Sequence, residues 1–511
     1  MSESSKMAQR FWELAQSQPG KLAIRFGMPG HTEDFDFAKF WRRVERVTGH
    51  LQSRHALKLG QRVAWLGLNH ELQLVTLVAC ARLGLLFMPL NFRLAVAELH
   101  KVLEDAKPSI LIHDELHNDA VASLSSAVPQ CCRLDSLISS PSPKHLVLPV
   151  LNQDSEVLLV YTSGTTGLPK GAVHTQAGLM ANATASDEAH EFKDTDIVLS
   201  TLPMFHVGGL CIQTLPALLA GVAVHLHPRF DASAWLASVS QGESGARPTL
   251  SLLVPATLRA VLEHAQWQSA DLKSLRGVMA GSSTLPQAYL EQFHERGVPV
   301  GQIYGTTETG PVSVVLKFRD AVQRIGFAGW PHAHLELQLR NAEGLVVKQG
   351  ETGEVCVRGP NLMRGYWQSA TQSTGEGLIQ GWFHTGDMGS LDADGCLQIV
   401  GRNKDMIISG GENIYPAEIE NALAAFPGLL ECAVVGLPDE RWGEVPVLVL
   451  VRSPTRAGQN LSEAAVKTHL EAHIARFKLP RRIVFKDELP KSALGKVQKP
   501  ILQNQLMSFN S

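Results

Sequence analysis

Paired cysteines and export signals are both missing from this sequence. Its seven cysteines form no C-x-x-C pair and are odd in number, which fits a reducing compartment better than a disulfide framework. The amino terminus is too polar for the apolar core of a signal peptide, and the longest apolar run, residues 72–90, is interrupted by Gln73, Arg82, Gly84 and Pro89. We therefore expect a cytoplasmic protein without a transmembrane segment, in which most cysteines are small core residues.

An excess of charge is missing as well. The chain has 46 Lys and Arg against 49 Asp and Glu, and its formal net charge of −3 gives no general attraction to nucleic acid. Two histidine patterns also fall short of a zinc site, because residues 113–117 depart from the H-E-x-x-H order and His225 and His227 lack a third ligand nearby. We expect both patterns to be structural or solvated, and we expect no nucleic-acid partner.

The 511 residues, with 44% hydrophobic content, allow a large buried core. Helical periodicity over residues 37–51 alternates with apolar runs at 62–66 and 109–113, which predicts α/β layers, and the Ser- and Pro-rich stretch 136–149 is typical of a loop. Beyond residue 400 a shorter alternating segment has the size of a small separate α+β domain. Its expected helices are 416–426 and 462–476, and its expected strands are 431–436, 447–451 and 482–486.

The most informative segment is residues 156–174, where an apolar run typical of a buried strand leads into a loop of hydroxyls, glycines and one lysine. Glycines let the backbone approach an anion and turn its N–H groups inward, while hydroxyls add donors and the lysine adds a positive charge. Pro169 excludes the G-x-x-x-x-G-K-[ST] spacing of a Walker loop. Taken alone, the segment could equally be a surface turn. Read as a site for a nucleotide triphosphate, its phosphate-binding residues are Ser163, Gly164, Thr165, Thr166, Gly167 and Lys170.

Five further segments follow in order along the chain. They are Gln-Ile-Tyr-Gly-Thr-Thr-Glu-Thr-Gly at 302–310, Gly-Trp-Phe-His-Thr-Gly-Asp at 381–387, Gly-Arg-Asn-Lys-Asp at 401–405, Ser-Gly-Gly-Glu-Asn-Ile-Tyr-Pro at 409–416 and Pro-Lys-Ser-Ala-Leu-Gly-Lys at 490–496. With the loop, they closely resemble the adenylate-forming (AMP-binding) superfamily of acyl-CoA synthetases, luciferases and peptide-synthetase adenylation domains. The resemblance implies a large multi-lobed N-terminal α/β domain, residues 1–401, that binds ATP and the acyl group. It also implies a small mobile C-terminal α+β domain, residues 402–511, that carries the catalytic lysine.

The activity implied by this resemblance is ATP-dependent carboxylate–CoA ligation. A carboxylate is a poor electrophile, so it first attacks the α-phosphorus of ATP and releases pyrophosphate; the acyl-adenylate then passes to the thiol and releases AMP. The expected acid is a medium- or long-chain fatty acid or an aryl acid, cinnamate- or benzoate-like. ATP, Mg²⁺ and CoA are the expected cofactors, and a homodimer is left open. Loading of a carrier-protein thiol is the nearest alternative, and a nonenzymatic nucleotide-binding scaffold is a more remote one.

The resemblance also assigns roles to residues of the catalytic step. Lys496 is expected at the carboxylate and the phosphates, and Thr165 at the triphosphate. Glu308, helped by Thr307 or by a threonine of the phosphate loop, is expected to bind Mg²⁺, a hard ion that prefers oxygen ligands. His206 is expected to gate the acyl tunnel.

Other positions match the family's nucleotide and thiol sites. Tyr304 is expected against adenine, Asp387 at the ribose hydroxyls and Arg402 beside them. The remaining nucleotide-binding residues are Gly281, Ser282, Gly305 and Thr306. Trp442, Phe477 and Arg481, with Arg93 as a further candidate, match positions that contact CoA in aryl-CoA ligases, since an aromatic plane with nearby cations suits adenine and phosphates.

Two features concern domain motion and acid choice. Lys404 matches the position at which the family hinges. Gly208 and Gly209 follow His206 where coumarate ligases have a bulky side chain, so we expect space for the acid there. The other expected lining residues are Ile212, Ile303, Gly305 and Ala280.

Overall fold

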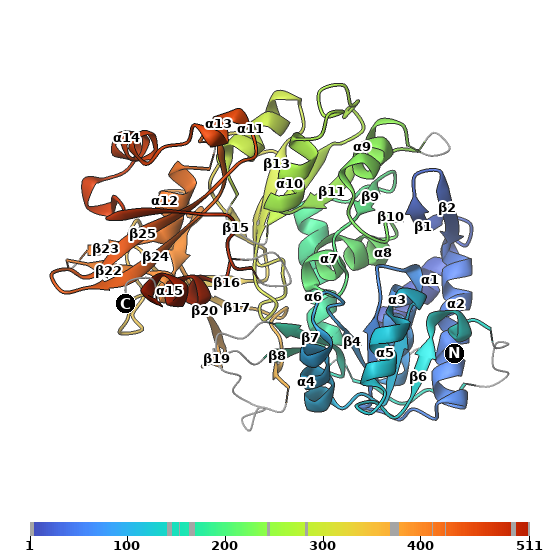
Figure 1. The fold of residues 1–511 in the computed structure, drawn as a ribbon. Coiled ribbons are helices and arrows are strands. Elements are labelled where there is room, and N and C mark those ends of the chain that lie inside the picture. The colour runs from blue at the N-terminus through green and yellow to red at the C-terminus, as the bar shows by residue number, and fades with distance from the viewer. Residues whose placement is uncertain are drawn as a thin grey trace.

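The computed structural model describes residues 5–139, 146–152, 154–162, 169–242, 246–281, 285–367, 378–410, 412–424, 426–491 and 497–508. Within these ranges the chain forms two large, mainly parallel sheets and two smaller, mainly antiparallel ones, with helices packed on them (Figure 1). The predicted fold class, a large N-terminal α/β part and a small C-terminal α+β part, is confirmed. No helix of the described residues is both long and apolar enough to span a bilayer.

The first large sheet has nine strands in the order β15-β14-β13-β12-β11-β9-β10-β1-β2. Its strands are β1 (Leu22–Met28), β2 (His31–Asp36), β9 (Ile197–Ser200), β10 (Ala223–Leu226), β11 (Leu250–Leu253), β12 (Gly277–Gly281), β13 (Val300–Tyr304), β14 (Val314–Leu316) and β15 (Trp330–Pro331). The strands from β13 to β1 run parallel. Ligands of such sheets bind beyond the carboxyl ends of the strands. Tyr304 is the last residue of β13 and lies at that end.

The second large sheet has seven strands in the order β18-β8-β7-β4-β3-β5-β6. Its strands are β3 (Arg62–Leu66), β4 (Leu86–Pro89), β5 (Ile110–His113), β6 (Cys131–Arg133), β7 (Glu156–Thr162), β8 (Lys170–Thr175) and β18 (Gly365–Tyr366). The predicted strands at 62–66 and 109–113 are confirmed as β3 and β5. The predicted strand that precedes the expected phosphate loop is confirmed as β7, which pairs antiparallel with β8 so that Thr162 lies opposite Lys170.

Helices pack between these two sheets and on their outer faces. They are α1 (Lys6–Ser17), α2 (Phe37–Gly49), α3 (Glu71–Leu83), α4 (Val96–Ala106), α5 (Asn118–Leu124), α6 (Gln176–His190), α7 (Val207–Gly209), α8 (Leu215–Ala220), α9 (Ala232–Ser240), α10 (Pro255–Leu262) and α11 (Gln287–Glu295), with short helices η1 (His50–Arg54), η2 (Glu115–His117), η3 (Leu134–Leu137) and η4 (Leu210–Thr214). The main hydrophobic cluster joins strands of both sheets with α1, α2, α3 and α8. The apolar run 72–90 is therefore the buried helix α3 and strand β4, not a membrane segment. The predicted helix 37–51 is α2, which continues into the π-helix η1.

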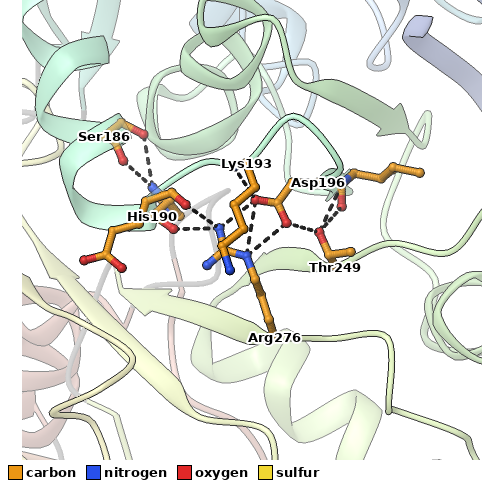
Figure 2. Close-up of polar contacts among 8 residues, drawn as sticks. Ser186, His190, Lys193, Asp196, Thr249 and Arg276 are labelled. Carbon is orange, nitrogen blue, oxygen red and sulfur yellow. Dashed lines mark hydrogen bonds and ion pairs between the residues drawn. The ribbon is translucent and has the colours of Figure 1, made fainter.

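A polar network fixes the amino ends of three parallel strands (Figure 2). Arg276, just before β12, pairs with Asp196, just before β9, at 2.7 Å and donates to the His190 carbonyl of α6 at 2.7 Å. Thr249, just before β11, donates to Asp196 Oδ1 at 2.7 Å. Burial raises the pKa of the Asp196 carboxyl, but these hydrogen bonds and that from Lys193 N more than offset it, so the pKa lies below its usual value. The network therefore lies at the amino ends of the strands, whereas Tyr304 lies at the carboxyl end of β13.

The two smaller sheets follow in the chain. The first has β16 (Glu336–Arg340), β17 (Gly353–Arg358), β19 (Leu378–Ile379), β20 (Trp382–Leu391) and β21 (Leu397–Arg402). The second has β22 (Ile407–Ser409), β23 (Glu412–Ile414), β24 (Leu429–Asp439), β25 (Gly443–Arg452) and β26 (Arg482–Lys486). The short helix η5 (Asn403–Asp405) separates them. A domain boundary at 401/402, which would fall at the end of β21, stays a prediction.

The C-terminal elements agree with the sequence pattern. The predicted strands 431–436, 447–451 and 482–486 are confirmed within β24, β25 and β26. The helices are α12 (Pro416–Ala422), α13 (Arg456–Gln459), α14 (Glu463–His473), α15 (Lys499–Ser508) and η6 (Arg476–Lys478). Both predicted helices exist but end early, at Ala422 instead of 426 and at His473 instead of 476. The Ser462 hydroxyl caps α14 by accepting from Ala465 N at 3.3 Å.

Candidate active site

A carboxylate and a cation from different sheets meet around one tyrosine. Glu308 follows β13, and its Oε1 accepts a hydrogen bond from the Tyr366 hydroxyl of β18 at 2.8 Å. Lys170, at the start of β8, places its Nζ 5.4 Å from the centroid of the Tyr366 ring. The Glu308 backbone is held by Met363 N, which donates to its carbonyl at 2.8 Å. The structure thus brings together two predicted residues, Lys170 and Glu308.

Tyr366 was absent from the predicted set. Its position depends on the antiparallel pairing of β18 with β8, in which Gly365 lies opposite Val173 and Tyr366 opposite Ala172. Almost two hundred residues separate the paired strands. No local pattern around residue 366 signals this pairing, so a single sequence offers no clue to the role of Tyr366.

The predicted ribose and adenine residues also converge. The Tyr304 hydroxyl donates to Asp387 Oδ2 at 2.9 Å, and Arg402 Nε lies 3.0 Å from Asp387 Oδ1. Asp387 is 6% exposed and lies directly opposite Arg402 in the β20–β21 pair. Burial and the Asp387 charge hold the pKa of Tyr304 well above its usual value, so the phenol stays protonated and remains a donor.

The turn that presents Asp387 is positioned by Glu354, a residue outside the predicted set. Gly386 N donates to Glu354 Oε1 at 3.0 Å, and His384 Nδ1 contacts Glu354 Oε2 at 2.9 Å. Gly386 has φ +72°, a conformation that favours glycine. A cavity of about 340 Å³ opens beside this turn, lined by Thr385, Gly386, Arg402, Asn403 and Lys404. Lys404, the predicted hinge residue, therefore borders the space next to Asp387.

The other predicted nucleotide residues lie where backbones pack closely. A Cβ on Gly281 would stand 2.5 Å from the Ile303 carbonyl oxygen, and one on Gly305 would stand 2.5 Å from that of Pro311. Both glycines are thus required by packing. Thr307 is 6% exposed, and the Thr306 hydroxyl is buried without a hydrogen-bond partner among the described residues. A buried hydroxyl of this kind is a ready contact for a polar ligand.

On the acid side, the two glycines after His206 differ. The His206 ring accepts from Gly208 N at 3.0 Å and caps α7. A Cβ on Gly209 would stand 2.3 Å from the Pro203 carbonyl oxygen, whereas one on Gly208 would meet only the His206 ring. Gly209 therefore serves close backbone packing, whereas a side chain at Gly208 would press on the His206 ring and on no backbone atom.

An apolar cluster adjoins this turn. Its members include Leu202, Ile212, Leu252, Met279 and Ile303. Two of the predicted lining residues, Ile212 and Ile303, belong to this cluster, and their contact with the acid stays a prediction. Ala280 is a correction, because it packs in a different cluster. Side chains alternate along β12, so Met279 shares a face with Ile303 and Ala280 points to the other face.

The predicted thiol-site residues are partly assembled. The Arg481 guanidinium carbon lies 5.1 Å from the centroid of the Trp442 ring, and the ring also packs on Gly410. Phe477 is 47% exposed and faces Lys478 Nζ at 5.5 Å rather than Trp442. Arg93 lies in the N-terminal part, 6.0 Å from the ring of Phe205. Trp442 and Arg481 thus form one surface, while Phe477 and Arg93 stand apart from it.

Several predicted residues lie outside the part of the chain that the structure describes. They are Ser163, Gly164, Thr165, Thr166, Gly167, Ser282 and Lys496. Described residues flank them: Thr162 pairs with Lys170, and Lys491 forms a bridge with Val497. The roles of these seven residues stay predictions from the resemblance.

Comparison with known proteins places this geometry in context. The family model described as AMP-binding enzyme matches residues 11–367, and the model of the AMP-binding enzyme C-terminal domain matches residues 418–496. The chain is 45% identical to an indoleacetate–CoA ligase of Aromatoleum aromaticum, over 94% of each chain. It is 40% identical to a feruloyl-CoA synthase of an Amycolatopsis species, over 95% of this chain and 96% of that one. The o-succinylbenzoate CoA synthetase of Bacillus subtilis, solved with its acyl-adenylate, is 31% identical and has a TM-score of 0.86 over 97% of each chain.

Proposed function

The chain belongs to the AMP-binding enzyme family and is an AMP-forming acid–CoA ligase, and we propose that its acid substrate carries an aromatic ring. The observation that carries the choice of a ring is that relatives at 45% and 40% identity are named for indoleacetate and feruloyl-CoA. The neutral apolar cluster of Leu202, Ile212, Leu252, Met279 and Ile303 beside the His206 turn supports an apolar acid. The long-chain fatty-acid ligase of Mycobacterium tuberculosis, at 32%, is more distant.

In the proposed first step the acid carboxylate attacks the α-phosphorus of ATP and pyrophosphate leaves. Such a transfer depends on placement and charge neutralisation more than on an acid or base. Asp387 would accept from the ribose hydroxyls, Lys170 would balance phosphate charge, and the buried Thr306 hydroxyl would donate to the nucleotide. The paired Tyr304 and Arg402 keep the Asp387 carboxylate oriented for this contact.

The residues around Glu308 fit a magnesium ion. The Tyr366 hydroxyl contacts Oε1 and fixes the plane of the carboxylate, so that Oε2 is presented as an oxygen ligand. We propose Glu308 and Thr307 as the protein groups nearest the ion, which when bound neutralises charge on the phosphates.

In the proposed second step, the C-terminal domain rotates about Lys404 and brings the thiol to the acyl-adenylate. We place the boundary between 401 and 402, at the end of β21. Lys496 serves the first step only. Trp442 and Arg481 support CoA as acceptor because an aromatic face next to a guanidinium suits adenine and phosphate. Their 5.1 Å contact favours CoA over the carrier-protein alternative.

Pyrophosphate release tests the proposal. The enzyme would be assayed with indole-3-acetate, ferulate, benzoate, octanoate and acetate, with and without CoA. We expect the ring-bearing acids to give the highest kcat/KM and CoA to be required for turnover beyond one equivalent. Preference for octanoate over every ring-bearing acid would replace the aryl proposal with the fatty-acid alternative.

A cytoplasmic location and a homodimeric assembly belong to the same proposal. Light scattering of the purified chain tests the assembly, for which a mass of about twice the 55.6 kDa of one chain is expected. Cell fractionation tests the location.

A further inference from the structure

A second group of metal-binding side chains lies at the far edge of the seven-stranded sheet. One of its members, Cys132, belongs to the edge strand β6. Tyr366 belongs to β18, the edge strand on the other side of the sheet, and Lys170 belongs to β8 next to it. Six strand spacings of about 4.8 Å separate the two edges by roughly 29 Å. Any ligand bound here would therefore be distinct from the nucleotide and from the Mg²⁺ expected at Glu308.

Two histidines converge because of the π-helix that follows α2. Its wide turn spans His50–Arg54 and places residues five apart on one face. The Nε2 atoms of His50 and His55 consequently lie 3.1 Å apart. Segments of π-helix are uncommon and frequently mark functional sites.

A thiol completes the group. Cys132 of β6 has its Sγ 3.9 Å from His50 Nε2, and the three donor atoms all lie within 4.8 Å of one another. Zinc bonds of about 2.0–2.1 Å to nitrogen and about 2.3 Å to sulfur give tetrahedral edges of about 3.3 Å for N···N and about 3.6 Å for N···S. The observed distances of 3.1 and 3.9 Å lie within a few tenths of an ångström of these edges.

The hydrogen bonding of His55 suits a metal. His55 Nδ1 lies 2.5 Å from Gln130 Oε1, and since an amide oxygen only accepts, Nδ1 carries the proton and Nε2 presents its lone pair. Metal-binding histidines commonly donate their other ring N–H in this way.

We propose that His50, His55 and Cys132 bind one Zn²⁺ ion, with a fourth coordination position open on the partly exposed His55 side. Binding releases the Cys132 thiol proton to solvent, and the proton held between the two Nε2 atoms moves to His50 Nδ1, so that each ring keeps one proton and presents a lone pair at Nε2. The Ser136 hydroxyl, 2.9 Å from Cys132 Sγ, can turn to donate to the resulting thiolate. The ion would tie the end of α2 to the edge strand β6, which is a structural role.

One other cluster has a similar composition but fits a metal less well. Glu354, Cys356 and His384 also present ligand atoms within 4.8 Å of one another. However, His384 Nδ1 already pairs with Glu354 at 2.9 Å, and His384 Nε2 is buried without a hydrogen-bond partner among the described residues. A ring bound through Nδ1 would lack the outer partner that orients such ligands. This cluster serves as the competing site in the test.

Cobalt binding tests the proposal on the full-length protein. The chain would be stripped with a chelator, saturated with Mg²⁺, and titrated with Co²⁺, which reports a thiolate ligand through a near-ultraviolet charge-transfer band. We expect one equivalent with that band, displaced by Zn²⁺. Cys132→Ser should abolish the band and weaken binding by about 100-fold or more, since even outer-partner changes typically cost 10- to 100-fold.

Matched variants make the result decisive. Cys131→Ser changes the exposed neighbour and Cys356→Ser changes the competing cluster; both should retain the band. His55→Gln, at a partly exposed position, should weaken binding without loss of the fold, and so keeps the test informative if Cys132→Ser misfolds. Zn²⁺ should raise the Tm of the wild type but not of His55→Gln. Absence of the band in the wild type, its survival in Cys132→Ser or its loss in Cys356→Ser would each overturn the proposal.

Discussion

The Tyr366 hydroxyl donates to Glu308 Oε1 at 2.8 Å and thereby joins the two large sheets at the candidate active site. Glu308 follows β13 of the nine-stranded sheet, and Tyr366 ends β18 of the seven-stranded one. Lys170, at the start of β8, lies over the same ring. The geometry at Glu308 therefore depends on how the two sheets are held together.

Replacement of Tyr366 by Phe should weaken use of Mg²⁺. A hydrogen bond to a charged group contributes about 1.5–3 kcal/mol, so we expect the apparent KM for Mg·ATP to rise about tenfold with a smaller fall in kcat. Pyrophosphate release over a range of Mg²⁺ concentrations measures this. Tyr289→Phe, on α11, is the control and should behave as wild type. Mg²⁺ dependence identical in Tyr366→Phe and wild type would mean that the hydroxyl does not orient the carboxylate.

Asp196→Asn should destabilise the nine-stranded sheet without changing substrate dependence. Loss of one partner of a buried ion pair costs about 3 kcal/mol or more, and the Asp196 side chain is 2% exposed in its pair with Arg276. Calorimetry should show a lower Tm. The matched exposed pair, Arg247 with Asp271 at 2.8 Å, supplies the control Asp271→Asn, for which little change is expected.

The same pair gives a pH dependence. The pKa of Asp196 is lower in the folded chain than its usual 3.8, so its contribution to stability is complete above about pH 4 and is lost as the pH falls through the folded value. The difference in Tm between wild type and Asp196→Asn should hence be constant near neutrality and shrink in acid. A difference that grows on acidification would contradict this sign.

The sequence predicted those features of the site that are carried by local motifs. Tyr304, Asp387 and Arg402 come from separate motifs, and the structure places all three in contact. Tyr366 was not predictable, because it depends on the register of two strands that are distant in the chain. Ala280 was assigned to the wrong face because a motif gives the order of residues but not which face of β12 each one occupies.

Lys496→Ala should separate the two half-reactions. By resemblance this lysine serves the adenylation step, and loss of one oriented charge partner costs about two to three orders of magnitude in rate. Pyrophosphate release would measure the first step, and thioester formation from a presynthesised acyl-adenylate the second. Thioester formation should largely survive. Lys491→Ala, which removes a lysine paired with Glu431, is the control, and equal damage to both steps in Lys496→Ala would refute the assignment.

Trp442→Ala should raise the KM for CoA by about tenfold and leave ATP and acid dependence nearly unchanged. The indole packs on Gly410 and faces Arg481, and a cation–π surface of this kind is worth about 1 kcal/mol or more when a ligand covers it. Thioester formation at varied CoA gives the measurement. Trp330→Ala, in the N-terminal part, controls for loss of a tryptophan. An unchanged KM for CoA would mean that Trp442 does not bind CoA, and it would favour a carrier-protein thiol as the acceptor.

Gly208→Phe should lower activity with large acids more than activity with acetate, because Gly208 and Gly209 have different surroundings. A side chain at 208 would meet only the His206 ring, whereas a Cβ at 209 would stand 2.3 Å from the Pro203 carbonyl oxygen. A phenyl group at 208 would therefore press on the His206 ring and not on backbone, and we expect it to occupy the space proposed for the acid beside the cluster that includes Ile212 and Ile303. We expect kcat/KM for indole-3-acetate, a cinnamate and octanoate to fall about 100-fold, while that for acetate changes little, since each buried methylene contributes about 0.8 kcal/mol.

Gly209→Ala is the contrast: it forces the backbone apart and should lower activity equally for all four acids. Uniform loss in both variants would mean that Gly208 also serves the turn and that the acid lies elsewhere.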